Sequence, residues 1–322
     1  MKYQLFGKHT GLPVSQIILG AANFGARKGY GASAEEIPAI LGTYADAGGN
    51  FIDISDRYQL GEAEEKVGEF IKSQRNNFVV CSKYTRSSES DPKPANLGNH
   101  RKSMQQAVDG SLRRLQTDYI DIYMPHYDDG LTPLEEIARG LEDLVKAGKV
   151  LYTGLANFPA WKASMVAQMV PLAALQIEYN LTQRTAEREL LPMAGHLGIG
   201  TMFYSPLAGG LLTGKYRHGE TGRLLRSRDD VVREDETTHG ILNKLETIAT
   251  ETHSTSGQVA LAWTFDRGGF PIIGARKINH LSEALNALEL KLTDEHISEL
   301  NVLSEISLGY PHDLLKTVQI SY

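Results

Sequence analysis

Residues 51–84 read FIDISDRYQLGEAEEKVGEFIKSQRNNFVVCSKY, and this stretch carries the pattern that decides the fold. A short apolar run, Phe51–Ile54, is followed by a segment with helical periodicity, Gly61–Lys72, and then by a second apolar run, Phe78–Ser82. Runs this short and this continuously apolar are typical of strands that are buried on both faces. The stretch therefore predicts a strand–helix–strand unit of a parallel sheet covered by helices.

The same pattern repeats along the chain. Eight apolar runs predict strands: Ile17–Leu19, Phe51–Ile54, Phe78–Ser82, Ile120–Met124, Leu151–Leu155, Ala174–Glu178, Gly200–Tyr204 and Phe270–Ile273. Segments with helical periodicity accompany them: Ala34–Gly48, Gly61–Lys72, Arg101–Leu115, Pro133–Ala147, Ala160–Met169, Thr185–Leu197, Ser256–Asp266 and Asn279–Leu288. Eight such units favour a closed (β/α)8 TIM barrel. An open dinucleotide-binding sheet would carry G-x-G-x-x-G after its first strand, where this chain has GAANFG (20–25).

We therefore expect residues 1–322 to form one domain, a single barrel with three additions. Residues 1–15 are expected to form a hairpin that plugs the bottom of the barrel, and residues 290–322 an extra helix (Thr293–Ser304) and a tail that caps its mouth. The polar segment 213–240 is either a solvated excursion or a lid over a phosphate-bearing ligand. Its basic residues favour the lid: Lys215, Arg217, Arg223, Arg226 and Arg228.

Composition narrows the class of protein. The formal net charge of −6 disfavours nucleic-acid binding. No apolar stretch approaches the roughly 20 residues that span a membrane, and the N-terminus lacks the apolar core of a signal peptide. The single cysteine, Cys81, cannot form an internal disulfide and is expected to be a buried, inert thiol. We expect a soluble cytoplasmic protein whose oligomeric state the sequence leaves open.

The chemistry should lie at the C-terminal ends of the strands, where TIM-barrel active sites are built. Polar residues end the predicted strands at these positions: Asn23, Asp53, Lys83, His126, Asn157, Gln176, Glu178, Tyr204, Ser205 and Arg276. Tyr58 follows Asp53 in the loop after the second strand. Each of these residues taken alone has an ordinary structural explanation, but Asp, Lys and His at successive strand ends favour one catalytic site.

Four of these residues suit the protonation of a developing alkoxide. A phenol titrates near pH ~10, and a neighbouring ammonium lowers its pKa by stabilising the phenolate. Lys83 can serve Tyr58 in this way while Asp53 keeps Lys83 charged, and His126 can donate a hydrogen bond to a substrate carbonyl. Tyr58 then becomes a proton donor or acceptor, as carbonyl reduction by hydride requires. A metal-dependent hydrolase or lyase is less favoured, because the sequence has no H-x-H pair or comparable ligand cluster, and no metal is expected.

At these residues the sequence resembles the aldo-keto reductase superfamily over nearly its whole length. The likeness rests on FIDISDRYQLGEAEEKVGEF (51–70), FVVCSKY (78–84) and DYIDIYMPHYDD (118–129). The stretch MFYSPLAGGLLTGKY (202–216) is typical of long-chain bacterial members, and GNHRKSMQQAVDGSLRRLQTDYIDIY (98–123) resembles the aryl-alcohol-dehydrogenase-like branch. The resemblance implies that Asp53, Tyr58, Lys83 and His126 are the catalytic tetrad, with Tyr58 as proton donor.

It further implies that NADP(H) binds across the barrel mouth. Asn157 and Gln176 would hold the nicotinamide carboxamide, and Tyr204 would stack on the nicotinamide ring. The remaining expected cofactor contacts come from the first strand's end, the pyrophosphate-binding loop and the adenosine end: Ala21, Ala22, Asp53, Ser205, Leu207, Gly209, Leu211, Lys215, Gly274, Arg276, His280 and Glu283. Ala156 stands where the family usually has Ser, and Ala284 ends a segment that often reads Glu-Asn, so NAD(H) remains an open alternative.

The function implied is an NADP(H)-dependent oxidoreductase that reduces small-molecule aldehydes or ketones. We expect the substrate pocket to carry Phe24, Tyr30, Tyr84 and Tyr127, with parts of the C-terminal tail. The alternative is an NADP(H)-binding, redox-sensing protein with little turnover.

Overall fold

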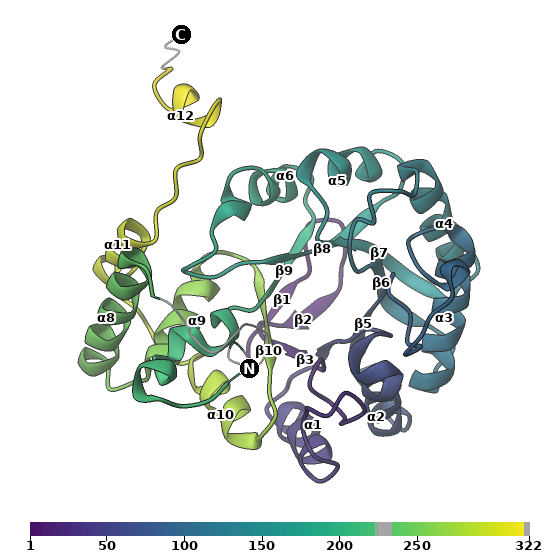
Figure 1. Ribbon diagram of the computed structural model, residues 1–322, viewed down its shortest axis with the longest axis horizontal. Helices are drawn as coiled ribbons and strands as arrows, with labels where there is room; N and C mark the ends of the chain where they lie inside the picture. The colour runs from purple at the N-terminus through teal and green to yellow at the C-terminus, as the bar shows by residue number, and fades with distance from the viewer. Residues whose placement is uncertain (223, 225–233, 319–322) are drawn as a thin grey trace.

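Eight parallel strands close into one barrel in the computed structural model, which describes residues 1–222, 224 and 234–318 (Figure 1). Around the barrel the strands follow the order β10-β3-β4-β5-β6-β7-β8-β9. Their bounds are β3 (Ile18–Gly20), β4 (Phe51–Asp53), β5 (Val79–Tyr84), β6 (Ile120–Pro125), β7 (Val150–Ala156), β8 (Leu172–Glu178), β9 (Gly200–Tyr204) and β10 (Phe270–Gly274). The predicted TIM barrel is confirmed, and each predicted run overlaps one strand.

Helices form a ring outside the barrel (Figure 1). The α-helices are α1 (Glu36–Asp46), α2 (Glu62–Ile71), α3 (Arg101–Leu115), α4 (Leu134–Lys146), α5 (Ala160–Ala167), α6 (Leu190–His196), α8 (Glu236–Glu251), α9 (Ser256–Asp266), α10 (Ile278–Asn286), α11 (Asp294–Leu303) and α12 (His312–Leu315). Short 3₁₀ helices are η1 (Tyr58–Gly61), η2 (Arg75–Asn77), η3 (Pro94–Asn96), η4 (Thr185–Glu187), η5 (Ala208–Thr213) and η6 (Lys215–His218).

The helices differ from the prediction at two places. The predicted helix Thr185–Leu197 is broken into η4 and α6, because the backbone leaves helical geometry at Glu189, whose φ is −142°. Helix α8 was not predicted, and its first turn lies within the segment taken as a loop. Its buried face is nevertheless helical in spacing, with Ile241, Leu245 and Ile248 inside, and the side chain of Asp235 caps its first turn by accepting from the Thr238 amide at 2.7 Å.

The predicted hairpin at the barrel bottom is confirmed. Strands β1 (Tyr3–Leu5) and β2 (Pro13–Ser15) pair antiparallel, and Phe6, fully buried, follows β1. The centroid of its ring lies 5.4 Å from that of Phe51 and 5.2 Å from that of Phe270, which begin β4 and β10. A Cβ atom added to Gly200 would lie 3.0 Å from the Phe6 ring. Glycine at the start of β9 therefore leaves room for the Phe6 side chain inside the barrel. The hairpin therefore closes the barrel interior at this end, and a polar site can form only at the opposite, C-terminal end of the strands.

The C-terminal tail turns away from the barrel, and α12 lies outside the ring of helices (Figure 1). The prediction that the tail caps the mouth is therefore wrong for the residues described. Polar contacts hold the tail beside the start of α6 instead: Arg188 donates to the carbonyl of Tyr310 at 3.0 Å, and His312 lies 3.6 Å from the Glu189 carboxylate.

Candidate active site

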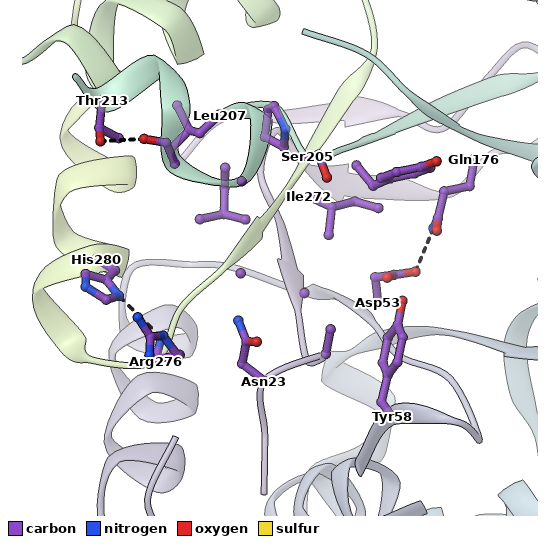
Figure 2. Close-up of a pocket in the computed structure, with 18 of the residues that line it drawn as sticks. Asn23, Asp53, Tyr58, Gln176, Ser205, Leu207, Thr213, Ile272, Arg276 and His280 are labelled. Carbon is purple, nitrogen blue, oxygen red and sulfur yellow. Dashed lines mark hydrogen bonds between the residues drawn. The ribbon is translucent and has the colours of Figure 1, made fainter. Parts of the chain in front are cut away.

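A pocket of about 350 Å³ opens at the C-terminal ends of the barrel strands (Figure 2). Most residues predicted for the site line it: Ala22, Tyr30, Asp53, Tyr58, His126, Tyr127, Asn157, Gln176, Tyr204, Ser205, Leu207, Gly209, Lys215, Gly274, Arg276, His280 and Glu283. The barrel thus gathers into one cavity side chains that are far apart in sequence.

Beneath the pocket, β5 and β4 place Lys83 against Asp53. The fully buried Nζ of Lys83 donates to Asp53 Oδ1 at 2.5 Å and to the Ile54 carbonyl at 2.7 Å. From across the barrel, Gln176 Nε2 on β8 donates to the same Asp53 oxygen at 2.8 Å. Burial acts to lower the pKa of Lys83, but the Asp53 carboxylate outweighs it and raises the pKa above its usual value. Lys83 is therefore held as a cation.

Tyr58 lies at the pocket end of this ion pair. Its hydroxyl points toward Asp53 (Figure 2), and Lys83 Nζ lies 5.3 Å from the centroid of its ring. The turn that carries Tyr58 is unusual, because Gln59 and Leu60 both adopt left-handed backbone angles, with φ of 49° and 57°. Gln59 fixes the turn to the loop after β3 by donating to the Tyr30 carbonyl at 2.6 Å and accepting from the Lys28 amide at 2.9 Å. Gln59 is not among the site residues predicted from the sequence.

His126 ends β6 on the other side of Tyr58. Its ring meets that of Tyr58 edge-on at a centroid distance of 5.7 Å and stacks on Tyr127 at 4.4 Å. Burial lowers the pKa of His126 to about 2, helped by the charges of Lys83 and Arg86. A neutral imidazole carries one N–H, so it can donate a hydrogen bond to a substrate without adding charge.

Asn157, after β7, and Tyr204, at the end of β9, continue the pocket lining beyond His126. The hydroxyl of Tyr204 donates to Asn157 Oδ1 at 2.9 Å, and Asn157 Nδ2 donates to the His126 carbonyl at 2.9 Å. Asn157 and Ser205 follow β7 and β9 with left-handed φ angles of 57° and 52°. The side-chain Nδ2 of Asn180 donates to the Ser205 carbonyl at 3.0 Å and supports that turn.

The far end of the pocket is basic. The guanidinium of Arg276 lies 4.6 Å from the centroid of the Tyr30 ring, and the Arg276 amide donates to His280 Nδ1 at 3.5 Å (Figure 2). Burial, followed by the charge of Arg276, lowers the pKa of Lys215. Within the described part of the chain, neither Arg276 nor Lys215 forms an ion pair with a carboxylate. Two half-buried cations in one cleft therefore favour an anionic ligand.

The loop between them presents backbone to the pocket. Gly209 and Gly210 in η5 have φ of 67° and 96°, which glycine adopts without strain. By contrast, Arg217 is paired with Glu234 at 2.9 Å and Glu246 at 3.1 Å and so secures the segment to α8. The other predicted basic residues of this segment, Arg223, Arg226 and Arg228, lie outside the described residues.

Some predicted site residues do not reach the pocket. Tyr84 and Phe24 are fully buried in the layer between barrel and helices, and Tyr84 stacks on Tyr123 at 5.4 Å. Their assignment to the substrate pocket is corrected. Alternation along β5 gives the reason, since Lys83 points inward and its neighbour Tyr84 must point outward. Ala21 and Leu211 also lie off the pocket lining, and described tail residues are absent from it.

Further lining residues were not assigned to the site from sequence. They are Gly20, Pro206, Gly210, Thr213, Ile272 and Ile273, with Asn23, which had been noted only as a strand end. Ile272 and Ile273 carry no signal beyond an apolar strand, so only the closed barrel reveals their place. Cys81, as expected, is buried inside the barrel, and burial raises the pKa of its thiol.

No helix in the described residues is long and apolar enough to cross a membrane, and no three His, Cys, Asp or Glu side chains among them converge as metal ligands. The sequence model of the Aldo/keto reductase family matches residues 16–305. The chain is 36% identical to "Aryl-alcohol dehydrogenase [NADP(+)]" of Phanerodontia chrysosporium, with 94% of this chain and 86% of that protein aligned. It is 32% identical to "Norsolorinic acid reductase" of Aspergillus flavus, with 97% and 84% aligned.

Proposed function

The chain belongs to the aldo/keto reductase family, and we propose that it reduces aldehydes or ketones with NADPH, with Tyr58 as the proton donor. The observation that carries this proposal is the convergence of three groups at one end of the pocket. These are the Tyr58 hydroxyl, the buried Lys83–Asp53 ion pair and the neutral imidazole of His126.

The pocket suits a dinucleotide in shape and charge. Its basic end, with Lys215 and Arg276, can receive phosphate groups, and the glycines of η5 let the backbone approach them. The other end is lined by Asn157, Tyr204 and Gln176, which offer amide groups and a flat ring to a nicotinamide. His280 and Glu283 extend the lining beyond Arg276, where the adenosine would lie.

The chain's own groups divide the remaining work. A bound reduced nicotinamide supplies hydride to the carbonyl carbon. His126 donates a hydrogen bond to the carbonyl oxygen and orients it, and Tyr58 transfers its phenolic proton to that oxygen as negative charge develops there. Lys83 stabilises the phenolate left on Tyr58, and Asp53 keeps Lys83 charged and aimed. The reverse sequence oxidises an alcohol.

An aromatic carbonyl compound is the substrate class that the pocket favours. Tyr127 lines the pocket and stacks on His126 beside Tyr58, and its flat ring favours stacking with an aryl group. The names of the two relatives, an aryl-alcohol dehydrogenase and a norsolorinic acid reductase, agree with this class.

Steady-state reduction of a panel of aromatic aldehydes by purified protein and NADPH tests the proposal. We expect turnover that is lost by at least about 10³-fold in Tyr58→Phe, while NADPH binding, measured by fluorescence, is retained. Turnover by Tyr58→Phe at the wild-type rate would remove Tyr58 from the proton-donor role. Tight NADPH binding without turnover on any aldehyde would instead favour a redox-sensing protein.

A further inference from the structure

Directly behind His126, the side chain of Ser55 connects the imidazole to a second carboxylate, Asp56. Ser55 Oγ lies 3.2 Å from His126 Nδ1 and 3.3 Å from Asp56 Oδ1. It also lies 3.3 Å from the Lys83 carbonyl and accepts from the Arg57 amide at 3.2 Å. Ser55 and Asp56 are buried, with 0% and 1% of their surface exposed. This link plays no part in the mechanism described above.

Asp56 has a route to solvent that does not pass through the active-site pocket. A second, polar cavity of about 470 Å³ lies between α3 and the loop after β5. Asp56 lines it together with Ser87, Glu89, Asp109, Arg113 and Arg114. Asp56 can therefore exchange a proton with water while the active-site pocket is filled.

The hydrogen bonds that Ser55 can form link the protonation of Asp56 to the tautomer of His126. A hydroxyl has one proton and two lone pairs, and the Arg57 amide already occupies one lone pair. When Asp56 is ionised, both Asp56 and the Lys83 carbonyl can only accept. Ser55 then donates to one of them, and its second lone pair is filled by an N–H on Nδ1 of His126. The neutral ring has no proton left for Nε2.

Protonation of Asp56 reverses this arrangement. The carboxylic acid donates to Ser55 and fills its second lone pair, so the Ser55 proton can be given to His126 Nδ1. The single ring proton of His126 then resides on Nε2, the nitrogen that can serve the pocket lined by the same imidazole. Only this tautomer donates a hydrogen bond to a substrate carbonyl.

We propose that Asp56, acting through Ser55, sets which ring nitrogen of His126 carries the proton, and is thereby a positioning residue for the carbonyl reduction proposed above. The inference rests on that proposed function only for its kinetic consequence. The protonated state of Asp56 favours reduction, because it supplies the donor tautomer. The ionised state leaves Nε2 as an acceptor, which suits the hydroxyl of an alcohol substrate.

The surroundings of Asp56 place this change near neutral pH. Burial, reinforced by the charge of Glu64 on α2, raises the pKa of Asp56 to about 7, and Arg114 on α3 opposes the rise. Charged and titratable groups face Asp56 from every neighbouring element: Lys28, Glu64, Glu89, Asp109, Arg113, Arg114 and the hydroxyl of Tyr123. Arg114 is held by Glu64 at 2.7 Å, so its charge is shared between the two carboxylates. His126 stays neutral throughout this range, so the tautomer changes without a change in ring charge.

Nitrogen-15 NMR of histidine-labelled full-length protein measures the tautomer directly, with the His126→Gln variant identifying the signals. We expect wild-type His126 to carry its proton on Nε2 at pH 6 and on Nδ1 at pH 8.5. Asp56→Asn, whose amide donates to Ser55 at every pH, should hold the Nε2–H form throughout. Ser55→Ala should give a tautomer that does not respond to pH. Glu89→Gln, which changes an exposed carboxylate of the same cavity that has no contact with Ser55, should keep the pH-dependent change of tautomer.

Kinetics provide the second readout. For a group with a pKa of about 7, the protonated fraction falls about 30-fold between pH 6 and 8.5. We therefore expect kcat for reduction to fall by roughly tenfold or more over this range in wild type and in Glu89→Gln. Asp56→Asn should show turnover near that of wild type at pH 6 and lose this fall. A tautomer that is the same at pH 6 and 8.5 in wild type would overturn the inference, as would an unchanged pH profile in a folded Asp56→Asn variant. If the tautomer switches but no aldehyde is reduced, the proposed function fails and the Asp56 link stands.

Discussion

Lys83 and Asp53 show how costly a buried ion pair is to maintain. Their side chains are 0% and 3% exposed, and each is the charge that compensates the other. Removing one partner of a buried pair leaves an uncompensated charge, whereas replacing both is often tolerated. Stability and catalysis can therefore be separated at this site by comparing single and double variants.

We expect Lys83→Met to lower the free energy of unfolding by about 3–5 kcal/mol, because Asp53 loses its counter-charge. The double variant Asp53→Asn with Lys83→Met should regain most of this loss but remain without aldehyde reductase activity. Urea unfolding and NADPH oxidation, measured on the same preparations, check both expectations. A double variant as unstable as Lys83→Met, or one with wild-type turnover, would contradict this account.

Asp56 gives a stability prediction that depends on pH. Its pKa in the folded protein, about 7, is above the ordinary 3.8, so the folded state binds the proton more tightly than the unfolded chain. The stabilising contribution is fully present below pH ~4 and is lost as pH rises through 7. Asp56→Asn should therefore be more stable than wild type at pH 8.5 by roughly 2–4 kcal/mol, with much of this difference absent at pH 4.5.

Urea unfolding of both proteins at the two pH values measures the difference. Glu89→Gln is the control, since its side chain is exposed and should change the free energy of unfolding by less than about 0.5 kcal/mol. An Asp56→Asn stabilisation that is equal at pH 4.5 and 8.5 would show that packing, and not ionisation, is responsible.

At the scale of elements, the sequence predicts those strands and helices that a local pattern of apolar residues determines. Each strand run was recognisable because an apolar core on both faces demands continuous Ile, Val and Phe. Helix α8 was missed although Ile241, Leu245 and Ile248 repeat at helical spacing, because the charge-dense residues before it suggested a loop. The error at Tyr84 is of the same kind. Its strand was predicted, but successive side chains of a strand point to opposite faces. The sequence alone did not show which residues of this strand face the barrel interior.

The hairpin formed by β1 and β2 is an element whose role can be measured. We expect Phe6→Ala to lower the free energy of unfolding by about 3–5 kcal/mol, because it opens a cavity between Phe51 and Phe270. Turnover at 25 °C should be close to wild type, since the pocket lies at the opposite end of the strands. Leu5→Ala is the matched control, because Leu5 is 61% exposed in the same hairpin. A Phe6→Ala variant as stable as Leu5→Ala would contradict the plug role.

At the scale of the whole molecule, closure of the barrel brings together residues that are far apart in sequence, and no local sequence pattern encodes these contacts. Asp53 and Gln176 are 123 residues apart, yet they share a hydrogen bond across the barrel. Residue types at strand ends were enough to nominate them for one site, because parallel strands present their C-terminal ends on one face. The Ser55–Asp56 link was not nominated, since adjacent polar residues in a loop carry no signal until packing buries them beside His126.

The whole-molecule charge leads to a final prediction. The chain carries a formal net charge of −6, which opposes binding of an anionic dinucleotide, so local cations must compensate. Arg276 is the half-buried guanidinium at the basic end of the pocket. If it contacts the 2′-phosphate, Arg276→Gln should weaken NADPH binding by about tenfold or more and leave NADH binding within about twofold. The salt dependence of NADPH binding should also decrease, because fewer charges are paired.

Fluorescence titrations at two ionic strengths measure both effects. The control is Arg188→Gln, because Arg188 lies beside the tail and off the pocket lining. Equal losses for NADPH and NADH would place Arg276 against a phosphate that both cofactors share, and the chain's preference between them would then have to come from His280 or Glu283.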